Sequence, residues 1–509
     1  MGSGITGELG KAARGGALAL IGMVVSAVFG FLVRAVVGRT FGPDQYGSYN
    51  LAITVFTVTL VFVMLGFPAG LQRQVAYMLH RGEEKVSELI GTAVILVTTA
   101  SILGVLVLEL TKPLLPRYIG GGELLVDLLS VLALALPFTA LFNVLISASQ
   151  GFGRVREFVL YGKIGFPGLN FILVTVLILV LGRITAVPLA YLLTATIMLF
   201  LLVRSLVKAG ILTPRPVFFP ELARYLLLFS LPLMTSNLTY LILNWTDTLM
   251  LGHYLGEGTV GLYNAASPLA RFIPVFLASL TVLYNPIATG FFARGELDKL
   301  GRFYSVITKW VVLLTFPLFL LLVAYPVPVL GTLFGGEYTG AWKPLVILSL
   351  GFAFNSLAGP TGLTLITMGM PGKNLKGDSL GAGLNVLLNY LLIPVYGMTG
   401  AALSTASSYI ATNLYKLSVL LRSGINPFNG RYVRILLGGS VITLAMLPLR
   451  TDSLVIALLL VALGSLAFYL IALLGGAFEE EDLELLKLAG ERFGINIEWI
   501  ERLLSRFAR

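Results

Sequence analysis

The stretch GRTFGPDQYGSYNLA at residues 38–52 is matched 214 residues later by GHYLGEGTVGLYNAA at residues 252–266. The two stretches share Gly42/Gly256, Gly47/Gly261, Tyr49/Tyr263, Asn50/Asn264 and Ala52/Ala266. The register continues at an offset of 215 through Asn170/Asn385, Gly182/Gly397 and Ala186/Ala401, and returns to 214 at Gly210/Gly424. Membrane proteins built from two like halves typically bind their substrate between the halves and rock about it. The repeat therefore indicates a transporter.

The composition identifies the solvent around most of the chain. Hydrophobic residues make up 57% of the 509 residues, charged residues only 12%, and the mean hydropathy is +0.91. Such a chain cannot cover itself with polar surface in water. Many apolar stretches approach or exceed the roughly 20 residues that a membrane-spanning helix needs. We predict an all-α polytopic membrane protein with fourteen transmembrane helices, which start near residues 15, 47, 87, 124, 158, 185, 222, 259, 304, 341, 377, 398, 432 and 453.

Lys and Arg residues predict the orientation. Most of the 35 fall in the segments that would be cytoplasmic if the N-terminus is cytoplasmic, and few fall in the opposite loops. This is the asymmetry of the positive-inside rule, and it requires an even number of crossings. We expect a multi-pass protein of the cytoplasmic membrane with both termini in the cytoplasm. The net charge of +10 then reflects topology, and no basic-aromatic module indicates nucleic acid.

The repeat divides the helices into parallel six-helix halves. We predict a cytoplasmic N-terminus (1–14), an N-lobe (15–210), a linker (211–221), a C-lobe (222–425), two further helices (432–475) and a cytoplasmic amphipathic tail (476–509). The two lobes start from the same side of the membrane, so their relating axis should run along the membrane normal. The two further helices either pack against the C-lobe or form a groove for a lipid tail.

The sequence lacks the residues that several kinds of chemistry require. The chain has no GxxxxGK[ST] phosphate-binding loop, no Cys and only two His residues. Disulfides, thiol chemistry and a His-based metal site are excluded. No Ser/His/Asp grouping is recognisable, so we do not expect an enzyme or a tightly bound cofactor.

Charged residues inside membrane spans are functional candidates, because placing a charge within the bilayer costs free energy. Arg34 lies mid-to-late in the first helix and Arg271 about a dozen residues into the eighth, while Asp247 lies deep in the seventh. One interpretation is that an arginine pairs with Asp247 or with backbone acceptors. The other is that the guanidinium groups bind the phosphate of an anionic substrate, which they can do bidentately.

The second half of the chain gains oxygen-bearing side chains. Asp247 aligns with Val33, Asn389 with Val174 and Thr405 with Ala190. Asn385, in contrast, aligns with another asparagine, Asn170. Asn385 and Asn389 share a helix face, and Thr405 follows Ala401 by one turn. A carboxylate, two amides, a hydroxyl and the Ala401 carbonyl suit a hard monovalent cation such as Na⁺. A polar cluster that joins packed helices is the alternative.

The chain resembles the polysaccharide-transporter branch of the multidrug/oligosaccharidyl-lipid/polysaccharide (MOP) exporter superfamily. The resemblance rests on residues 38–52, on LP…N…D between 231 and 247, on LFGGEY at 333–338 and on LIPVYG…GAA between 392 and 402. It covers about residues 15–475 and is closest to Wzx-type flippases of polyprenyl-linked oligosaccharides. The family implies two six-helix lobes around a V-shaped central cavity, two added C-terminal helices and alternating access.

A related branch, the peptidoglycan-precursor flippases, implies roles for individual residues. Its helix-1 pattern Gly-Phe-x-x-Arg is matched by residues 30–34, which implies a lumen role for Arg34. Its sodium site falls on Asp247, Asn385, Asn389, Ala401 and Thr405. Asn389 stands where that branch has an acid, so weaker sodium affinity is implied, and proton coupling through Asp247 stays open.

We therefore expect a flippase of polyprenyl-(pyro)phosphate-linked oligosaccharides, driven by a Na⁺ or H⁺ gradient and serving surface glycan synthesis. Arg34 and Arg271, with Arg73 at the inner end of helix 2, would bind the phosphate. We expect a monomer in contact with membrane lipids, with glycan polymerase or transferase machinery as a candidate partner. The alternatives are a lipid II flippase, a cation-coupled multidrug exporter and, with less support from the short outer loops, a glycosyltransferase.

Overall fold

The computed structural model describes residues 2–83, 85–212, 216–426, 428, 430–478 and 482, apart from the side chains of residues 2–20, 235–238 and 240. Most of the predicted tail thus lies outside the described residues. The described chain is helical and contains no strand. It divides into two compact units, Met1–Asn264 and Ala265–Arg509.

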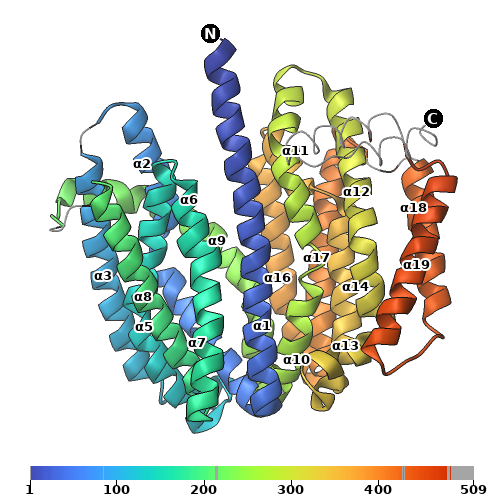
Figure 1. Cartoon of the computed structure of the whole chain (residues 1–509), viewed down its shortest axis with the longest axis horizontal. Helices are drawn as coiled ribbons and strands as arrows, with labels where there is room; N and C mark the ends of the chain where they lie inside the picture. Colours follow the sequence, from blue (N-terminus) through green and yellow to red (C-terminus); the bar gives the residue numbers. More distant parts are fainter. Residues whose placement is uncertain are drawn as a thin grey trace. The chain divides into compact units, whose positions relative to one another are not determined.

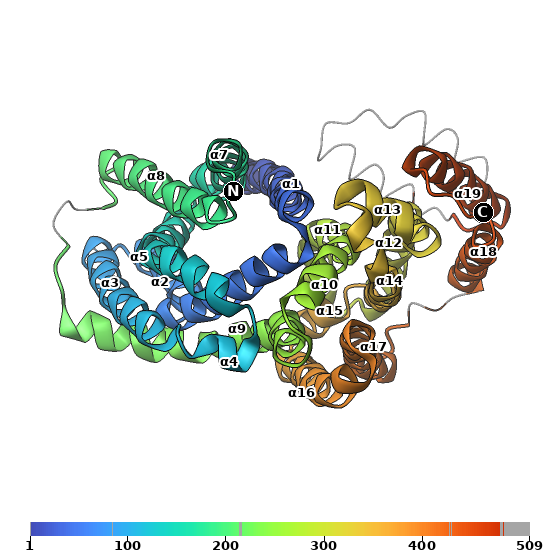
Figure 2. The same cartoon turned by 90° about the horizontal axis from the view of Figure 1, so that it is seen from below.

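The first unit contains nine helices that begin and end within its described residues, one π-helix and the start of α10 (Figure 1). They are α1 (Gly2–Val63), α2 (Phe67–His80), α3 (Val86–Thr111), α4 (Leu115–Ile119), α5 (Gly122–Gly151), α6 (Val155–Glu157), the π-helix η1 (Phe158–Gly165), α7 (Phe166–Leu181), α8 (Ala186–Lys208), α9 (Pro220–Leu255) and α10 (Glu257–Ala270). Within this unit α5 lies between α3 and α8 and contacts both (Figure 2).

The second unit continues with the end of α10 and the remaining helices of the described chain. They are α11 (Val275–Ala293), α12 (Leu297–Ala324), α13 (Pro326–Leu333), the 3₁₀ helix η2 (Gly336–Ala341), α14 (Trp342–Ala358), α15 (Thr361–Thr367), α16 (Pro371–Tyr396), α17 (Met398–Arg422), α18 (Gly430–Met446) and α19 (Leu454–Leu474). The boundary between the units falls within α10, because α9 packs against α1, α2 and α3. The lobe boundaries predicted from the repeat describe a sequence duplication and stay a prediction.

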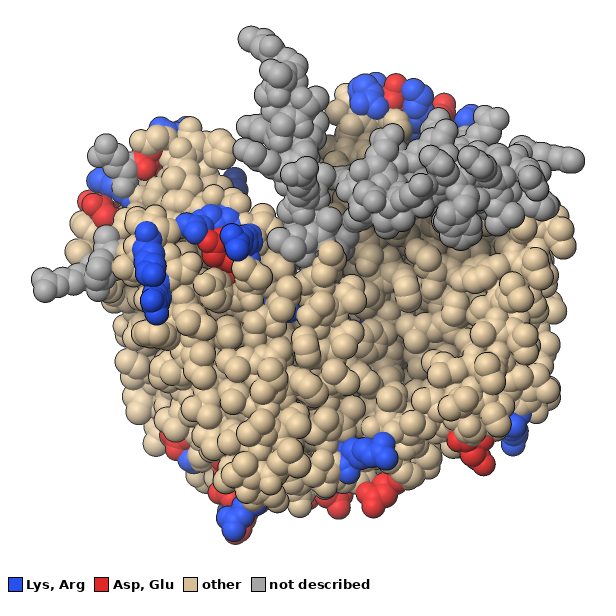
Figure 3. Space-filling view, in the orientation of Figure 1, with Lys and Arg blue, Asp and Glu red and all other residues tan. Residues whose placement is uncertain are grey.

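Ten helical segments among the described residues are long and apolar enough to cross a membrane. This is fewer than the fourteen predicted starts. Residues 21–80 count as one segment, although the starts near residues 15 and 47 predicted two helices. In addition, α18 has only 17 residues, and α17 carries many Ser, Thr and Asn side chains. Large apolar side chains such as Leu179, 81% exposed, and Leu110, 77% exposed, face outward. On the face shown in Figure 3, Lys, Arg, Asp and Glu gather toward the helix ends, and uncharged side chains lie between them.

The repeated stretches fold alike. Gly42 has φ 73° and ψ 176°, and its counterpart Gly256 has φ 81° and ψ 177°. Each breaks a helix, since this conformation lies outside the helical region and is open mainly to glycine. The Asn50 side chain donates to the Tyr46 carbonyl at 2.7 Å, and the Asn264 side chain donates to the Val260 carbonyl at 3.0 Å. The sequence repeat is therefore also a repeat of local structure.

The two copies cross each other at their glycines. A Cβ atom on Gly47 would lie 1.8 Å from the carbonyl oxygen of Glu257, and one on Gly261 would lie 1.9 Å from the carbonyl oxygen of Pro43. The offset of 214 that relates Gly47 to Gly261 also relates Pro43 to Glu257. The crossing of α1 and α10 is thus symmetric with respect to the repeat, and only glycine allows the backbones to approach this closely.

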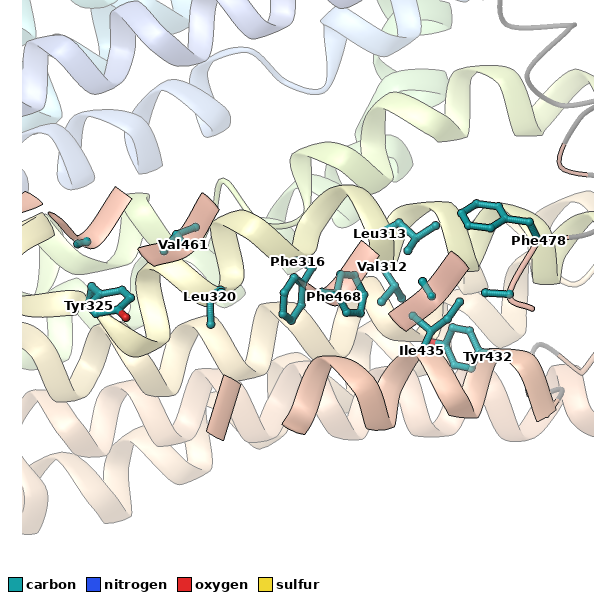
Figure 4. Close-up of a cluster of buried hydrophobic side chains, with 13 residues drawn as sticks. Val312, Leu313, Phe316, Leu320, Tyr325, Tyr432, Ile435, Val461, Phe468 and Phe478 are labelled. Atoms are coloured by element: carbon teal, nitrogen blue, oxygen red, sulfur yellow. The ribbon is translucent and has the colours of Figure 1, made fainter. Parts of the chain in front are cut away.

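The last two helices pack on α12 in the second unit. Phe316 of α12 stacks on Phe468 of α19 with ring centroids 3.9 Å apart, and Ile435 of α18 belongs to the same buried cluster (Figure 4). Beside this cluster is a mostly apolar cavity of about 460 Å³, lined by residues of α12, α14, α17, α18 and α19 that include Thr315, Phe319 and Thr443. These contacts show that α18 and α19 pack against α12, as one of the two predictions for these helices expected. The alternative of a lipid-tail groove stays a prediction.

Candidate functional site: arginines and oxygen ligands in the membrane helices

Arg34 lies in α1, eight residues before the break at Gly42. Its side chain is half-buried, and Tyr46 and Tyr49 follow the break in the same helix. Among the residues that the structure describes, Arg34 forms no ion pair with a carboxylate. The predicted pairing of Arg34 with Asp247 is therefore absent from this part of the chain.

Arg73 is exposed on α2, and its guanidinium lies 4.7 Å from the ring centroid of Phe229 on α9. The neighbouring Gln74 is buried, and its Oε1 accepts a hydrogen bond of 2.7 Å from the Tyr225 hydroxyl, also on α9. Arg73 therefore contributes to the packing of α2 on α9 through a cation–π contact. Its predicted phosphate-binding role has to coexist with this contact.

Arg271 does not lie inside a continuous helix. Residues 271–274 form turns between α10 and α11, and Pro274 ends this break. The Arg271 Nε donates to the Ser267 hydroxyl at 3.2 Å, and the guanidinium lies 5.8 Å from the centroid of the Phe352 ring. The predicted eighth helix is interrupted here, because proline lacks the amide hydrogen that would continue the ladder. Broken helices at membrane depth are typical of binding sites in transporters.

Asp247 is 1% exposed and lies near the end of α9. The hydroxyl of Tyr263, on α10, donates a 2.5 Å hydrogen bond to its Oδ2. One residue further along both helices, the Asn264 amide donates to the Thr248 hydroxyl at 3.2 Å. Sequence reasoning missed Tyr263 as a partner of Asp247, although Tyr263 is one of the residues that the repeat aligns.

Asn385, Asn389 and Thr405 come together in the second unit. The Asn385 amide donates to the Thr405 hydroxyl at 3.1 Å, and the Asn389 amide donates to Asn385 Oδ1 at 3.1 Å. All three side chains are buried, as is Ala401. The hairpin of α16 and α17 closes tightly, because a Cβ on Gly400 would lie 2.3 Å from the Leu392 carbonyl oxygen. Four of the five predicted ion-site residues are therefore on this hairpin, and Asp247 belongs to the other compact unit.

The chemistry of these residues fits a hard cation of low charge. Their oxygens come from amides, a hydroxyl and a backbone carbonyl, which are ligands that Na⁺ accepts and soft metals do not prefer. Among the described residues, no group of three or more His, Cys, Asp and Glu side chains is arranged to hold a metal ion.

Two ion pairs of buried lysines were not expected from the sequence. Lys416 Nζ lies 2.7 Å from Asp378 between α17 and α16, and Lys309 Nζ lies 2.5 Å from Asp482. Lys309 and Lys416 are among the lysines of the segments that were predicted to be cytoplasmic. Their side chains are only 5% and 9% exposed. Helical spacing could have indicated Asp378, since it lies seven residues before Asn385 on the same face of α16.

A comparison with family models decides the family. The model described as polysaccharide biosynthesis protein matches residues 12–286, which is more than half of the chain. The chain belongs to this polysaccharide biosynthesis family. The resemblance to the polysaccharide-transporter branch is thereby confirmed. A second model, MatE, matches residues 232–391 of this family member.

Relatives with curated names resemble this polysaccharide biosynthesis family protein over most of its length. It is 22% identical over 497 residues to an uncharacterized membrane protein of Methanocaldococcus jannaschii, which covers 91% of the chain and 95% of the relative. It is 24% identical over 396 residues to the probable low-salt glycan biosynthesis flippase Agl15 of Haloferax volcanii, which covers 76% of the chain and 80% of the relative.

Solved structures share the fold. The lipid II flippase MurJ in an inward closed conformation matches with a TM-score of 0.72 at 15% identity, covering 89% of this chain and 97% of that one. A multidrug resistance MATE family transporter in an inward-facing conformation matches with a TM-score of 0.62 at 16% identity, covering 79% and 94%. The chain thus shares its fold with the lipid II flippase MurJ and with a MATE family transporter.

Proposed function

We propose that this protein is a flippase that moves a polyprenyl-(pyro)phosphate-linked oligosaccharide across the cytoplasmic membrane for surface glycan synthesis. It would work by alternating access of two six-helix lobes around a central cavity, with fourteen transmembrane helices and both termini in the cytoplasm. The observation that carries the proposal is Arg34, an arginine in a membrane helix with no carboxylate partner among the described residues. Family membership and the glycan-flippase relative in Haloferax volcanii support the substrate class.

The arginines would bind the phosphate. Desolvation of the phosphate charge is the main barrier to its crossing of the membrane, and a guanidinium that offers paired N–H donors lowers that barrier. Arg34 and Arg271 are the principal candidates, with Arg73 as a third. The helix break at Arg271 supports its role, because irregular backbone at membrane depth is tolerated where it is buried in protein or lines a cavity.

A cation gradient would drive the cycle. Asp247 would supply the negative charge, and Asn385, Asn389, Thr405 and the Ala401 carbonyl would supply neutral oxygens. A bound Na⁺, or a proton on Asp247, would add positive charge to these residues. The ion would shift the conformational equilibrium only by the difference in its affinity for the two states.

The test is flipping in proteoliposomes. Purified protein is given a fluorescent polyprenyl-linked oligosaccharide, with and without an inward Na⁺ or H⁺ gradient. Arg34→Ala and Arg271→Ala are expected to lose transport while folding is retained. Arg204→Ala, at an exposed position on α8, is the matched control and should transport normally. Normal transport by both lumen variants would refute the phosphate-binding role.

Two other substrates are tested in the same vesicles. Lipid II is the first because the fold resembles MurJ, and a cationic dye is the second because the MatE model matches residues 232–391. Transport of lipid II but not of other lipid-linked glycans would make the protein a peptidoglycan-precursor flippase. Dye efflux without glycan flipping would make it a multidrug exporter.

A further inference from the structure

The contact between Asp247 and Tyr263 is the basis of this inference. Both side chains are 1% exposed, and the hydroxyl lies 2.5 Å from the carboxylate. The neighbouring contact between Thr248 and Asn264 fixes the register of α9 and α10 at this level. An ionised carboxylate that accepts a hydrogen bond from a buried hydroxyl is held in one orientation, because charge-assisted hydrogen bonds are short and strong.

The sequence repeat supplies an internal comparison for this contact. Tyr263 aligns with Tyr49, and Asp247 aligns with Val33. Tyr49 and Val33 are both buried, so the first half keeps the aromatic ring but has an apolar residue in place of the carboxylate. A ring at this position therefore does not require a carboxylate partner. The pair of hydroxyl and carboxylate is a property of the second copy.

We propose that Tyr263 is a positioning residue for cation binding by Asp247. The inference rests on the proposed ion coupling and adds to it a residue that neither the family comparisons nor the sequence pattern assigns. The hydroxyl takes one lone-pair position on Oδ2 and fixes the carboxylate plane, while a carboxylate has about four such positions in all. Partners that orient a ligand in this way are typically worth about 10- to 100-fold in metal affinity.

The same region is also bonded to α1. The Tyr46 hydroxyl of α1 donates to the backbone carbonyl of Asn264 at 3.3 Å. Asn264 directly follows Tyr263 in α10. A cation that changes the orientation of Asp247 and Tyr263 therefore acts on a turn of α10 that is hydrogen-bonded to Tyr46 of α1.

The experiment measures Na⁺ binding without transport. Thermal unfolding of the full-length protein is followed while NaCl replaces choline chloride at constant ionic strength, since a ligand that binds only the folded state raises the melting temperature by mass action. The wild-type protein is expected to be stabilised by Na⁺, and Asp247→Asn is expected to lose the effect. Tyr263→Phe should need about 10-fold more Na⁺ for the same shift. Tyr49→Phe, the matched control from the other repeat copy, should respond like the wild type.

Equal Na⁺ midpoints for Tyr263→Phe and Tyr49→Phe would overturn the proposal. The absence of any Na⁺ effect on the wild-type protein would also overturn it, and the flippase proposal would then be judged by the glycan assay alone. If Tyr263→Phe does not fold, Asp247→Glu provides the second test. The added methylene displaces the carboxylate from the Tyr263 hydroxyl, so the same rise in the Na⁺ midpoint is expected.

Discussion

The crossing of α1 and α10 gives a sharp prediction for Gly47→Ala. The new Cβ would lie 1.8 Å from the carbonyl oxygen of Glu257 and 2.6 Å from its carbonyl carbon. Ordinary contact begins at 3.4 Å, so the helices must separate by about 1.5 Å. Because the obstacle is backbone, no side-chain rotation relieves the clash.

The expected cost follows from overpacking. Inserting one carbon into a well-packed site destabilises a protein by about 1–3 kcal/mol, and a backbone obstacle places Gly47→Ala near the upper end of this range. The repeat sharpens the expectation. A single separation of the helices also makes room at Gly261, so the double variant with Gly261→Ala should cost clearly less than the sum of the two single changes.

The assay is thermal unfolding in lipid nanodiscs, followed by intrinsic fluorescence. Gly30→Ala is the matched control on the same helix, because a Cβ there meets no atom within 4 Å. It should be neutral or stabilise by up to about 1 kcal/mol, since alanine is the better helix former. A Gly47→Ala protein as stable as Gly30→Ala, or strict additivity in the double variant, would refute the close crossing.

Three further predictions concern packing and charge. Lys309→Ala should destabilise by about 3–5 kcal/mol, because it leaves Asp482 as an uncompensated buried charge; the double variant Lys309→Met with Asp482→Asn should recover most of the loss, and denaturant unfolding measures both. Phe468→Ala should cost about 3–5 kcal/mol and enlarge the cavity beside α19, which a lowered melting temperature and increased binding of an apolar fluorescent probe would report. Arg73→Gln should cost only about 0.5–1 kcal/mol through loss of the contact with Phe229, so a large drop in flipping at normal stability would identify a substrate role.

The sequence alone was enough to predict the membrane environment, the all-α fold class, the family and the internal duplication. These follow from local properties, namely the length of apolar stretches and glycines at fixed offsets. The glycine pairs Gly42/Gly256, Gly182/Gly397 and Gly210/Gly424 all have positive φ, which is why the repeat was readable as aligned glycines. The helix spacing of Asn385 and Asn389, and the predicted proximity of Thr405, also appear in the structure.

Only the tertiary structure decided which partners the charged residues have. Arg34, Lys309 and Lys416 are all basic residues, yet their partners differ. Lys309 is in a buried ion pair, Lys416 pairs with the partly exposed Asp378, and Arg34 pairs with no described carboxylate. Tyr263 and Asp247 lie sixteen residues apart on two helices, so their contact depends on the turn at Gly256 between those helices. Such contacts are set by how helices cross, and helical periodicity gives a residue's face but not the helix that covers it.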